Sequence, residues 1–298
     1  MKDKAKKSTY RISVPANFSF RHTVESHGWY DLAPFRYDPQ KSELAYTFRP
    51  ANGSPEAVRI KEAKGALSLT VFGEAARTEV IAAVKHIMRL DEPLDEFYSL
   101  ISQTPGLDWA ANANAGRLLR SSTVYEDLVK SLCTTNCSWA LTKKMVTNLV
   151  ELLGEPSADG SRAFPTASAM AARPESFYRD EIRAGYRSSY FAEMADSIAS
   201  GRVDPEKWLD ADMPTPELKK EIKKVKGVGD YAAENLLKLL GRYDGLALDS
   251  WLRSGFYKKH NRERKCPDRK IERHYSKFGK WRGLAIWCDM TESWFDEK

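Results

Sequence analysis

Residues 217–253 constrain the fold more than any other part of the sequence, because they predict two short amphipathic helices joined by a tight glycine turn. Gly227 and Gly229 interrupt the helical pattern, and glycine permits the positive φ and the close backbone approach that such a turn needs. The apolar residues on both sides recur at helical spacing and can share one core: Ile222, Val225, Val228, Ala232, Ala233, Leu236, Leu237 and Leu240. We therefore predict a helical hairpin at about residues 216–240.

The second helix of this hairpin is predicted to bind an anion at its first turn. The amides of Gly229, Asp230 and Tyr231 open that helix without intrahelical partners, at the positive end of its dipole. Lysines crowd the same segment, and the whole chain has a net charge of +6; the lysines are Lys219, Lys220, Lys223, Lys224 and Lys226. A phosphodiester is therefore the expected anion.

One carboxylate, Asp249, stands a helix and a turn beyond the hairpin, at the end of an apolar run that starts at Leu246. Two interpretations are open at this point. The carboxylate serves chemistry at a site beside the hairpin, or it caps the next helix over Trp251 and Leu252, a position that aspartate favours.

The segments 226–233, KGVGDYAA, and 246–249, LALD, together resemble the helix-hairpin-helix DNA glycosylase superfamily. Residues 116–120 and 125–138 are similar to the stretch of 8-oxoguanine and alkylpurine glycosylases that opens the helical core and carries the strand-reading loop. Further similar segments are 18–21, 182–190 and 281–285, so the resemblance spans most of the chain. Since a catalytic aspartate follows the hairpin in that superfamily, the resemblance implies that Asp249 is catalytic.

The same resemblance implies which residues contact DNA. A glycosylase flips the target nucleotide out of the duplex, and intercalating side chains fill the gap. Tyr186 is the expected intercalating residue, with packed core as the alternative, and Asn136 is expected at the unpaired partner base, with a helix C-cap as the alternative. The full set expected to bind DNA is Gly227, Gly229, Lys226, Asn136, Tyr186 and Arg187.

A tyrosine stands where bifunctional relatives carry their nucleophilic lysine, two residues past the second hairpin glycine. Tyr231 has no amine for a Schiff base, so we expect a monofunctional enzyme. Alkylpurine glycosylases also place an aromatic residue there, and an aromatic pocket attracts a positively charged alkylated base through cation–π interactions. The expected base pocket consists of Tyr231, Trp251, Trp281 and Trp287, although ordinary packing is the alternative for each tryptophan.

The function that follows is base-excision repair by hydrolysis of the N-glycosidic bond of damaged purines, of the alkylated, 3-methyladenine type. The first alternative is the same fold acting on oxidised or deaminated purines such as 8-oxoguanine or hypoxanthine, because the central segments resemble the 8-oxoguanine enzymes at least as closely. The second is a non-catalytic helix-hairpin-helix protein that grips the DNA backbone. Asp249 argues against the second, since a phosphate clamp gains nothing from a carboxylate facing a polyanion.

No cofactor or metal is expected. The cysteines are Cys133, Cys137, Cys266 and Cys288, and only two of them follow Asp249, so the four-cysteine iron–sulfur cluster of some relatives is not predicted. A zinc site from Cys266, His260 and His274 fits no zinc spacing. The resemblance allows a monovalent cation on the hairpin carbonyls.

The predicted fold class is α+β. Residues 1–90 are expected to form an antiparallel β-sheet subdomain, because their short β-branched and aromatic runs alternate with turn signals, and residues 91–298 a two-lobed helical core. No apolar run approaches the length of a membrane span. We expect an intracellular monomer, cytoplasmic and nucleoid-associated if bacterial, whose partner is double-stranded DNA containing a damaged base.

Overall fold

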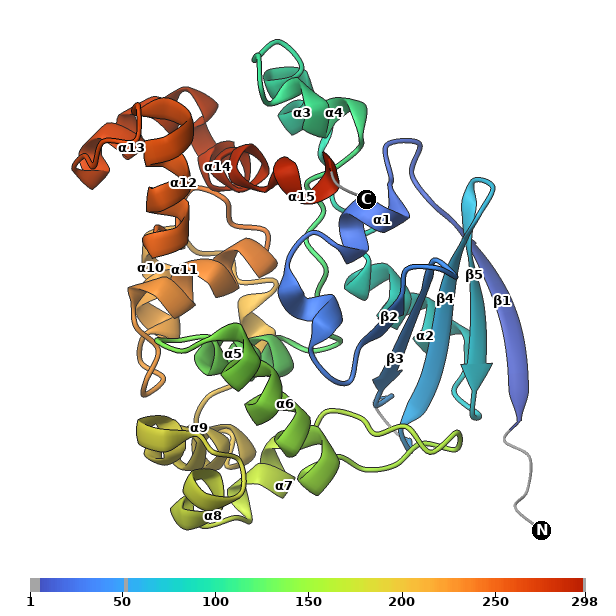
Figure 1. Ribbon diagram of the computed structural model, residues 1–298. Helices are drawn as coiled ribbons and strands as arrows, with labels where there is room; N and C mark the ends of the chain where they lie inside the picture. The colour runs from blue at the N-terminus through green and yellow to red at the C-terminus, as the bar shows by residue number, and fades with distance from the viewer. Residues whose placement is uncertain (1–5, 51–52, 297–298) are drawn as a thin grey trace.

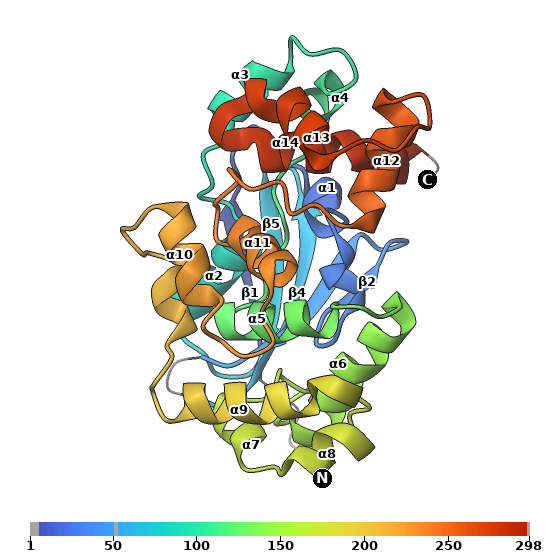
Figure 2. The same ribbon diagram turned by 90° about the vertical axis from the view of Figure 1, so that its left-hand side faces the viewer.

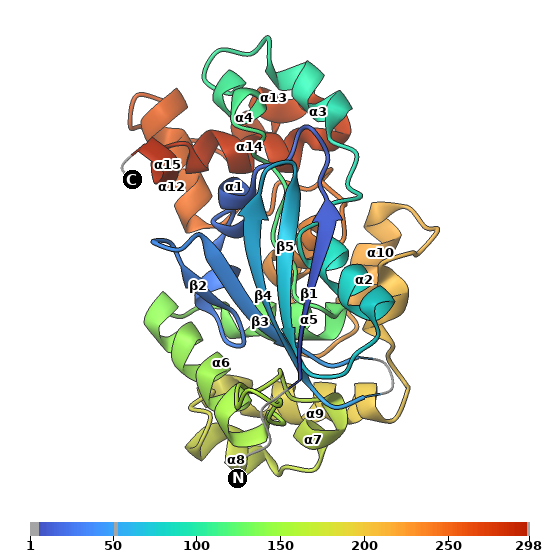
Figure 3. The same cartoon turned by 90° about the vertical axis from the view of Figure 1, so that its right-hand side faces the viewer.

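A five-stranded antiparallel sheet forms the N-terminal part of the computed structural model, which describes residues 6–50 and 53–296 (Figure 1). The strand order is β1-β5-β4-β3-β2. The strands are β1 (Lys7–Ser13), β2 (Arg36–Asp38), β3 (Glu43–Phe48), β4 (Glu56–Ala63) and β5 (Ala66–Phe72). In Figure 3 this sheet lies in front of most of the helices.

The sheet has one apolar and one polar face, because successive side chains along a strand point to opposite faces. One row of directly opposed residues across four strands packs on the core: Tyr10, Leu69, Ile60 and Leu44. The next row is exposed or half-buried: Arg11, Ser68, Lys61 and Glu43. The apolar face therefore packs against the helical part of the molecule.

Two short helices, α1 (Phe20–Val24) and the 3₁₀ helix η1 (Gly28–Asp31), lie between β1 and β2, and the remaining helices follow the sheet. From α2 to α9 they are α2 (Arg77–Ile87), α3 (Asp95–Ile101), α4 (Asp108–Asn112), α5 (Val124–Cys133), α6 (Trp139–Leu153), α7 (Ala167–Ala171), α8 (Glu175–Asp180), η2 (Gly185–Arg187) and α9 (Ser188–Ala199). The C-terminal ones are η3 (Pro205–Trp208), α10 (Thr215–Ile222), α11 (Asp230–Leu239), α12 (Ser250–His260), α13 (Asp268–Tyr275), η4 (Ser276–Trp281), α14 (Arg282–Thr291) and α15 (Ser293–Asp296).

The helices form two groups, with α5, α10 and α11 between them. Figure 2 shows α6 to α9 at one end of the molecule and α12 to α14, with α3 and α4, at the other. The predicted class, an antiparallel sheet followed by a helical core, is confirmed. Among the described residues, no helix has the length and apolar character required to cross a membrane.

A buried polar cluster joins the sheet to α5. The hydroxyl of Tyr46 on β3 donates to Glu126 Oε2 at 2.6 Å, and Lys130 Nζ donates to the other carboxylate oxygen at 2.6 Å. Burial raises the pKa of Glu126, although Lys130 and Tyr46 act in the opposite direction. A buried pair of this kind is costly to break, because either partner alone would be an uncompensated charge. It holds α5, which leads to Asn136, against the sheet.

Candidate active site

A cavity of about 880 Å³ lies between the two groups of helices, and α11 and the start of α12 form one of its walls. Tyr231, Asp249, Trp251 and Trp287 all line it. The remaining lining residues are Glu25, His27, Gly28, Trp29, Tyr30, Leu118, Ser131, Thr134, Cys137, Trp139, Thr142, Asn235, Lys238, Leu239, Ala247, Leu252, Trp294 and Phe295. The structure thus brings together the predicted carboxylate and three of the four predicted pocket aromatics.

Asp249 both lines this cavity and caps α12. Its Oδ1 accepts a hydrogen bond from the Leu252 amide at 2.7 Å, and its extended backbone is typical of an N-cap residue. The capping alternative is therefore a real contact. Capping and chemistry are compatible, because the capping bond uses only Oδ1, and Oδ2 accepts no hydrogen bond from the described residues.

Tyr231, in the first turn of α11, lies close enough to Asp249 for their charges to interact. Burial raises the pKa of the Tyr231 phenol, the Asp249 charge raises it further, and a hydrogen bond with Thr134 lowers it. The phenol therefore stays protonated at neutral pH. Asn235 and Lys238 follow Tyr231 by one and two helical turns, so one face of α11 contributes all three to the cavity wall.

Three tryptophans form an aromatic cluster on the cavity wall. The ring centroids of Trp251 and Trp294 are 5.3 Å apart, those of Trp287 and Trp294 5.7 Å, and those of Trp251 and Trp287 5.8 Å. Trp251 and Trp294 remain 40% and 39% exposed, so flat apolar surface is open to a ligand. Trp294 and Trp139 were not expected here, because single tryptophans distant in sequence carry no signal of a shared site.

Lys238 is the least expected residue in the cavity wall, since a lysine is rarely buried without a partner. Only 3% of its surface is exposed, its Nζ donates to the Leu246 carbonyl at 3.2 Å, and Nζ lies 5.3 Å from the centroid of the Trp287 ring. Burial lowers the pKa of Lys238 to about 8. The available signal was its position seven residues after Tyr231, on the same helical face.

Trp281 lies elsewhere. It is buried, with its ring 5.5 Å from that of Tyr243 and 5.6 Å from that of Phe97, and it lines a different cavity. The sequence-based expectation placed it in the base pocket because its segment resembles one that flanks the site in relatives. In this structure its role is packing at the end of η4, and we leave it out of the proposed pocket.

The two hairpin glycines differ in backbone conformation and in the space around them. Gly227 has φ +86°, and a Cβ on it would lie 2.4 Å from Cδ2 of Tyr190 on α9, so both the conformation and the space exclude a side chain. Gly229 is the N-cap of α11 with φ −86°, and no atom lies within 4 Å of a Cβ built there. The expectation of a positive φ was correct for Gly227 and wrong for Gly229, which instead leaves open space before the helix.

Ion pairs hold most of the hairpin lysines. Asp230 pairs with Lys219 and Lys223, both at 3.0 Å, and Lys226 pairs with Glu193 at 2.6 Å. Lys224 pairs with Glu221 within its own segment. Exposed pairs of this kind contribute little to stability because water screens their charges, so an incoming phosphate can replace them.

Asn136 and Tyr186 lie together on the surface. Asn136 has φ +46°, lies beyond the end of α5, and its Nδ2 donates to the Tyr186 hydroxyl at 3.4 Å. Tyr186 is 52% exposed, and its ring lies 6.0 Å from that of Tyr190, the residue packed on Gly227. The hairpin, the predicted intercalating residue and the predicted strand-reading residue are thus neighbours.

Arg187 differs from its expected role as a direct DNA contact. It is 3% exposed, its Nε donates to Thr135 Oγ1 at 3.0 Å, and its guanidinium lies 4.5 Å from the centroid of the Tyr186 ring. The sequence could not distinguish an exposed arginine from one that turns under its neighbour. Arg187 therefore supports the ring of Tyr186 from below.

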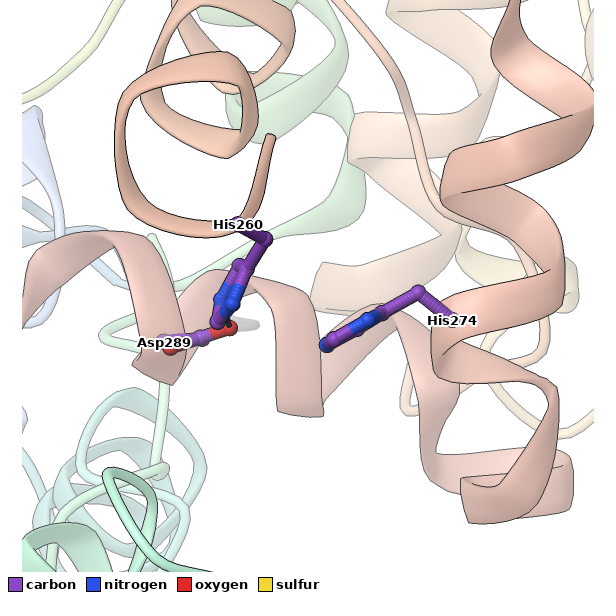
Figure 4. Close-up of side chains that lie close together, drawn as sticks. All are labelled: His260, His274 and Asp289. Atoms are coloured by element: carbon purple, nitrogen blue, oxygen red, sulfur yellow. Dashed lines mark hydrogen bonds and ion pairs between the residues drawn. The ribbon is translucent and has the colours of Figure 1, made fainter. Parts of the chain in front are cut away.

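A second polar cluster lies outside the cavity, where α12, α13 and α14 meet. The ligating atoms of His260, His274 and Asp289 are all within 4.8 Å of one another (Figure 4). The Asp289 carboxylate lies 2.7 Å from His260 Nε2, 2.5 Å from the Tyr275 hydroxyl and 2.8 Å from Lys259 Nζ. Burial raises the pKa of Asp289, but these three neighbours lower it to a net value below the usual one.

Among the described residues, His260, His274 and Asp289 are the group whose spacing could accommodate a metal ion, and Cys266, considered with the two histidines from sequence, is not part of it. The ammonium of Lys259 already forms an ion pair with the Asp289 carboxylate, so the cluster fits a structural clamp between helices better than a metal site. The clamp joins α12, whose N-cap residue is Asp249, to α14, which carries Trp287. The four cysteines are all free.

Comparisons with known proteins identify the fold. Neither a protein-family model nor a curated protein matches the chain. Among solved structures, a 3-methyladenine DNA-glycosylase from Archaeoglobus fulgidus is similar, with a TM-score of 0.78 and 17% identity. The match covers 97% of this chain and 100% of the other. The Clostridium acetobutylicum 8-oxoguanine glycosylase/lyase, in complex with double-stranded DNA containing cytosine opposite 8-oxoG, has a TM-score of 0.76 at 17% identity, with 100% of both chains covered.

A DNA-3-methyladenine glycosidase from Bacillus halodurans is similar over less of the chain, with a TM-score of 0.52, 17% identity, and 68% of this chain and 92% of that one covered. At these identities the comparisons establish a shared fold. The fold expected from the sequence resemblance, that of the helix-hairpin-helix DNA glycosylases, is therefore confirmed.

Proposed function

We propose that this protein is a DNA glycosylase that flips a damaged base out of double-stranded DNA and hydrolyses its N-glycosidic bond. One observation carries the proposal: Asp249 and Tyr231 lie in the wall of an aromatic cavity of about 880 Å³, beside the hairpin. That volume is within the roughly 300–1,000 Å³ typical of small-molecule sites. A protein that only grips phosphates has no use for such a cavity.

The roles of the residues follow from their positions. The hairpin and its lysines bind the DNA backbone, and Tyr186 with Asn136 occupies the gap that the flipped nucleotide leaves. The base enters the cavity and stacks on the tryptophan cluster. Asp249 stabilises the positive charge that develops on the sugar and orients the water that attacks C1′; the bond from C1′ to the base nitrogen breaks, and an abasic site remains.

We further propose hydrolysis without a covalent intermediate. Tyr231 stands at the position of the nucleophilic lysine of bifunctional relatives, and its phenol cannot form a Schiff base. The aromatic cluster supports a purine substrate of either kind considered from sequence, alkylated or oxidised and deaminated, because every base has a face for stacking. The cavity residue that distinguishes them is Lys238.

The test is base release from duplexes that each carry one damaged base. Wild-type protein and Asp249→Asn are incubated with duplexes containing hypoxanthine, 1,N6-ethenoadenine, 8-oxoguanine or 3-methyladenine, and strands are resolved with and without alkali. We expect release of at least one base, loss of release in the variant, and strand breaks only after alkali. Tight duplex binding without release of any base would favour the non-catalytic alternative.

A further inference from the structure

Lys238 places a positive charge in the wall of a cavity that is otherwise aromatic. Its ammonium has three N–H donors, and within the described residues one of them is donated, to the Leu246 carbonyl at 3.2 Å. No described carboxylate lies within ion-pair distance of it. A buried ammonium with unused donors at a ligand cavity is typical of a group that completes its hydrogen bonds with the ligand.

The ionisable groups that act on Lys238 lie on α11, at the N-cap of α12 and on α14, and both carboxylates among them accept hydrogen bonds from other groups. Glu234, on the same helix, accepts from Lys219 at 2.5 Å and from the Ala247 amide at 2.6 Å. Asp249 at the start of α12 and Cys288 on α14 also raise the pKa of Lys238, but burial outweighs all three. His27 also lines the cavity, and burial holds its pKa at about 4, so this ring is neutral and does not compete for the ligand.

We propose that Lys238 selects the base: it donates a hydrogen bond to a carbonyl oxygen of an uncharged damaged base, and it disfavours a cationic base. This inference rests on the proposed glycosylase function. It favours the oxidised or deaminated purines over the alkylated type that the aromatic residues alone suggest. A cationic base stacked on Trp287 would share that ring with the ammonium, and two like charges in a buried site repel each other strongly.

Three probes separate charge from hydrogen bonding. Hypoxanthine is uncharged and has a carbonyl, 1,N6-ethenoadenine is uncharged and has none, and 3-methyladenine in DNA is cationic and has none. Rates of release are measured under single-turnover conditions, with spontaneous loss in protein-free samples subtracted. For wild-type protein we expect the acceleration over spontaneous loss to be largest for hypoxanthine and smallest for 3-methyladenine.

The variant Lys238→Gln keeps a donor but removes the charge, and Lys238→Met removes both. A hydrogen bond from a charged group gives about tenfold or more in discrimination. The release rate of hypoxanthine divided by that of 1,N6-ethenoadenine should therefore fall by at least about tenfold in Lys238→Met. The release rate of 3-methyladenine divided by that of 1,N6-ethenoadenine should rise in both variants. Lys259→Gln, a control that removes a lysine bonded to Asp289 and Glu292 outside the cavity, should change neither ratio.

The pH dependence of the wild-type protein tests the same inference without a variant. The protonated form of Lys238 is the one that binds the carbonyl, so hypoxanthine release should fall as pH rises through about 8, while 3-methyladenine release should rise. Lys238→Gln should lose these opposite trends. A role in packing alone would change neither the ratios nor the pH trends.

A direct binding measurement covers the case in which the variants are unstable. Free hypoxanthine is titrated against wild-type protein while the fluorescence of the cavity tryptophans is followed, and quenching should be stronger at pH 7 than at pH 9. Equal loss of all three activities in both Lys238 variants, with unchanged ratios, overturns the inference and leaves the glycosylase function standing. Absence of base release by the wild-type protein overturns both.

Discussion

Replacement of Asp249 by asparagine separates the two roles that the structure gives this side chain. Asp249 caps α12 through its Oδ1, 2.7 Å from the Leu252 amide, and it lines the cavity. Asparagine caps helices about as well as aspartate, so the free energy of unfolding should change by less than about 0.5 kcal/mol. The negative charge is lost, and with it the proposed stabilisation of the positive charge on the sugar.

The expected loss of base release is about a hundredfold or more, which corresponds to about 2.7 kcal/mol in the activation free energy. Asp249→Ala serves as the matched variant, because it removes the cap as well and should cost about 1 kcal/mol of stability in addition. Activity should be similarly low in both variants, while the melting temperature should fall clearly only in Asp249→Ala. DNA affinity should be equal to or higher than that of the wild-type protein, since one negative charge near phosphates is gone.

The assay combines single-turnover release of a base that the wild-type protein excises, thermal unfolding, and fluorescence anisotropy with a labelled duplex. The reasoning is refuted if Asp249→Asn retains near wild-type turnover. It is also refuted if activity follows the melting temperature across the two variants, because Asp249 would then act only as a helix cap.

Three further outcomes are expected. Gly227→Ala should destabilise the protein and weaken binding to all duplexes alike, because its Cβ would lie 2.4 Å from Tyr190. Gly229→Ala should unfold like wild type, whereas a bulky residue at position 229 should weaken binding without base selectivity. Melting curves measure the stability of these variants, and anisotropy curves measure their DNA affinity. Sodium borohydride added during turnover should trap no protein–DNA adduct, and an adduct that disappears in Lys238→Gln would contradict the monofunctional proposal. Acidification from pH 7 to pH 5 should destabilise the fold by about 2 kcal/mol through His27. The pKa of His27 is about 4 in the folded protein and near 6.5 in the unfolded chain, so stability is lost as pH falls from 6.5 towards 4. In urea unfolding, the free energy of unfolding of wild type should therefore depend more steeply on pH than that of His27→Gln.

The parts of the site that sequence could predict are close together along the chain. Tyr231 and Asp249 are separated by one helix and a turn, and the resemblance of this segment to the helix-hairpin-helix DNA glycosylases implied that both belong to one site; in the structure both line one cavity. The strand pattern likewise predicted an antiparallel sheet followed by helices, and β5 ends at Phe72 before α2 begins at Arg77. The helices and strands could be predicted because they depend on local backbone geometry, which hydrophobic periodicity and turn residues reveal.

The predictions that differed from the structure concern which way a side chain points. Arg187 turns under Tyr186, and Trp281 packs between Phe97 and Tyr243, because burial of each depends on elements far away in sequence. Gly229 has an ordinary φ, since the N-cap position needs no left-handed backbone. No spacing rule contains this information.

The rest of the cavity wall explains why the substrate was harder to infer than the chemistry. Part of that wall comes from η1, α14 and α15, and its tryptophans, Trp29, Trp287 and Trp294, are far apart in the sequence. Lys238 is an intermediate case: its position on the face of Tyr231 follows from helical spacing, but its burial against Trp287 depends on α14. A solvent-exposed lysine there would have no influence on base choice, since water would screen its charge and satisfy its donors. The same side chain becomes a selective group because a distant helix excludes water from it, so base preference should change with substitutions in α14 even where Asp249 and the hairpin are left intact.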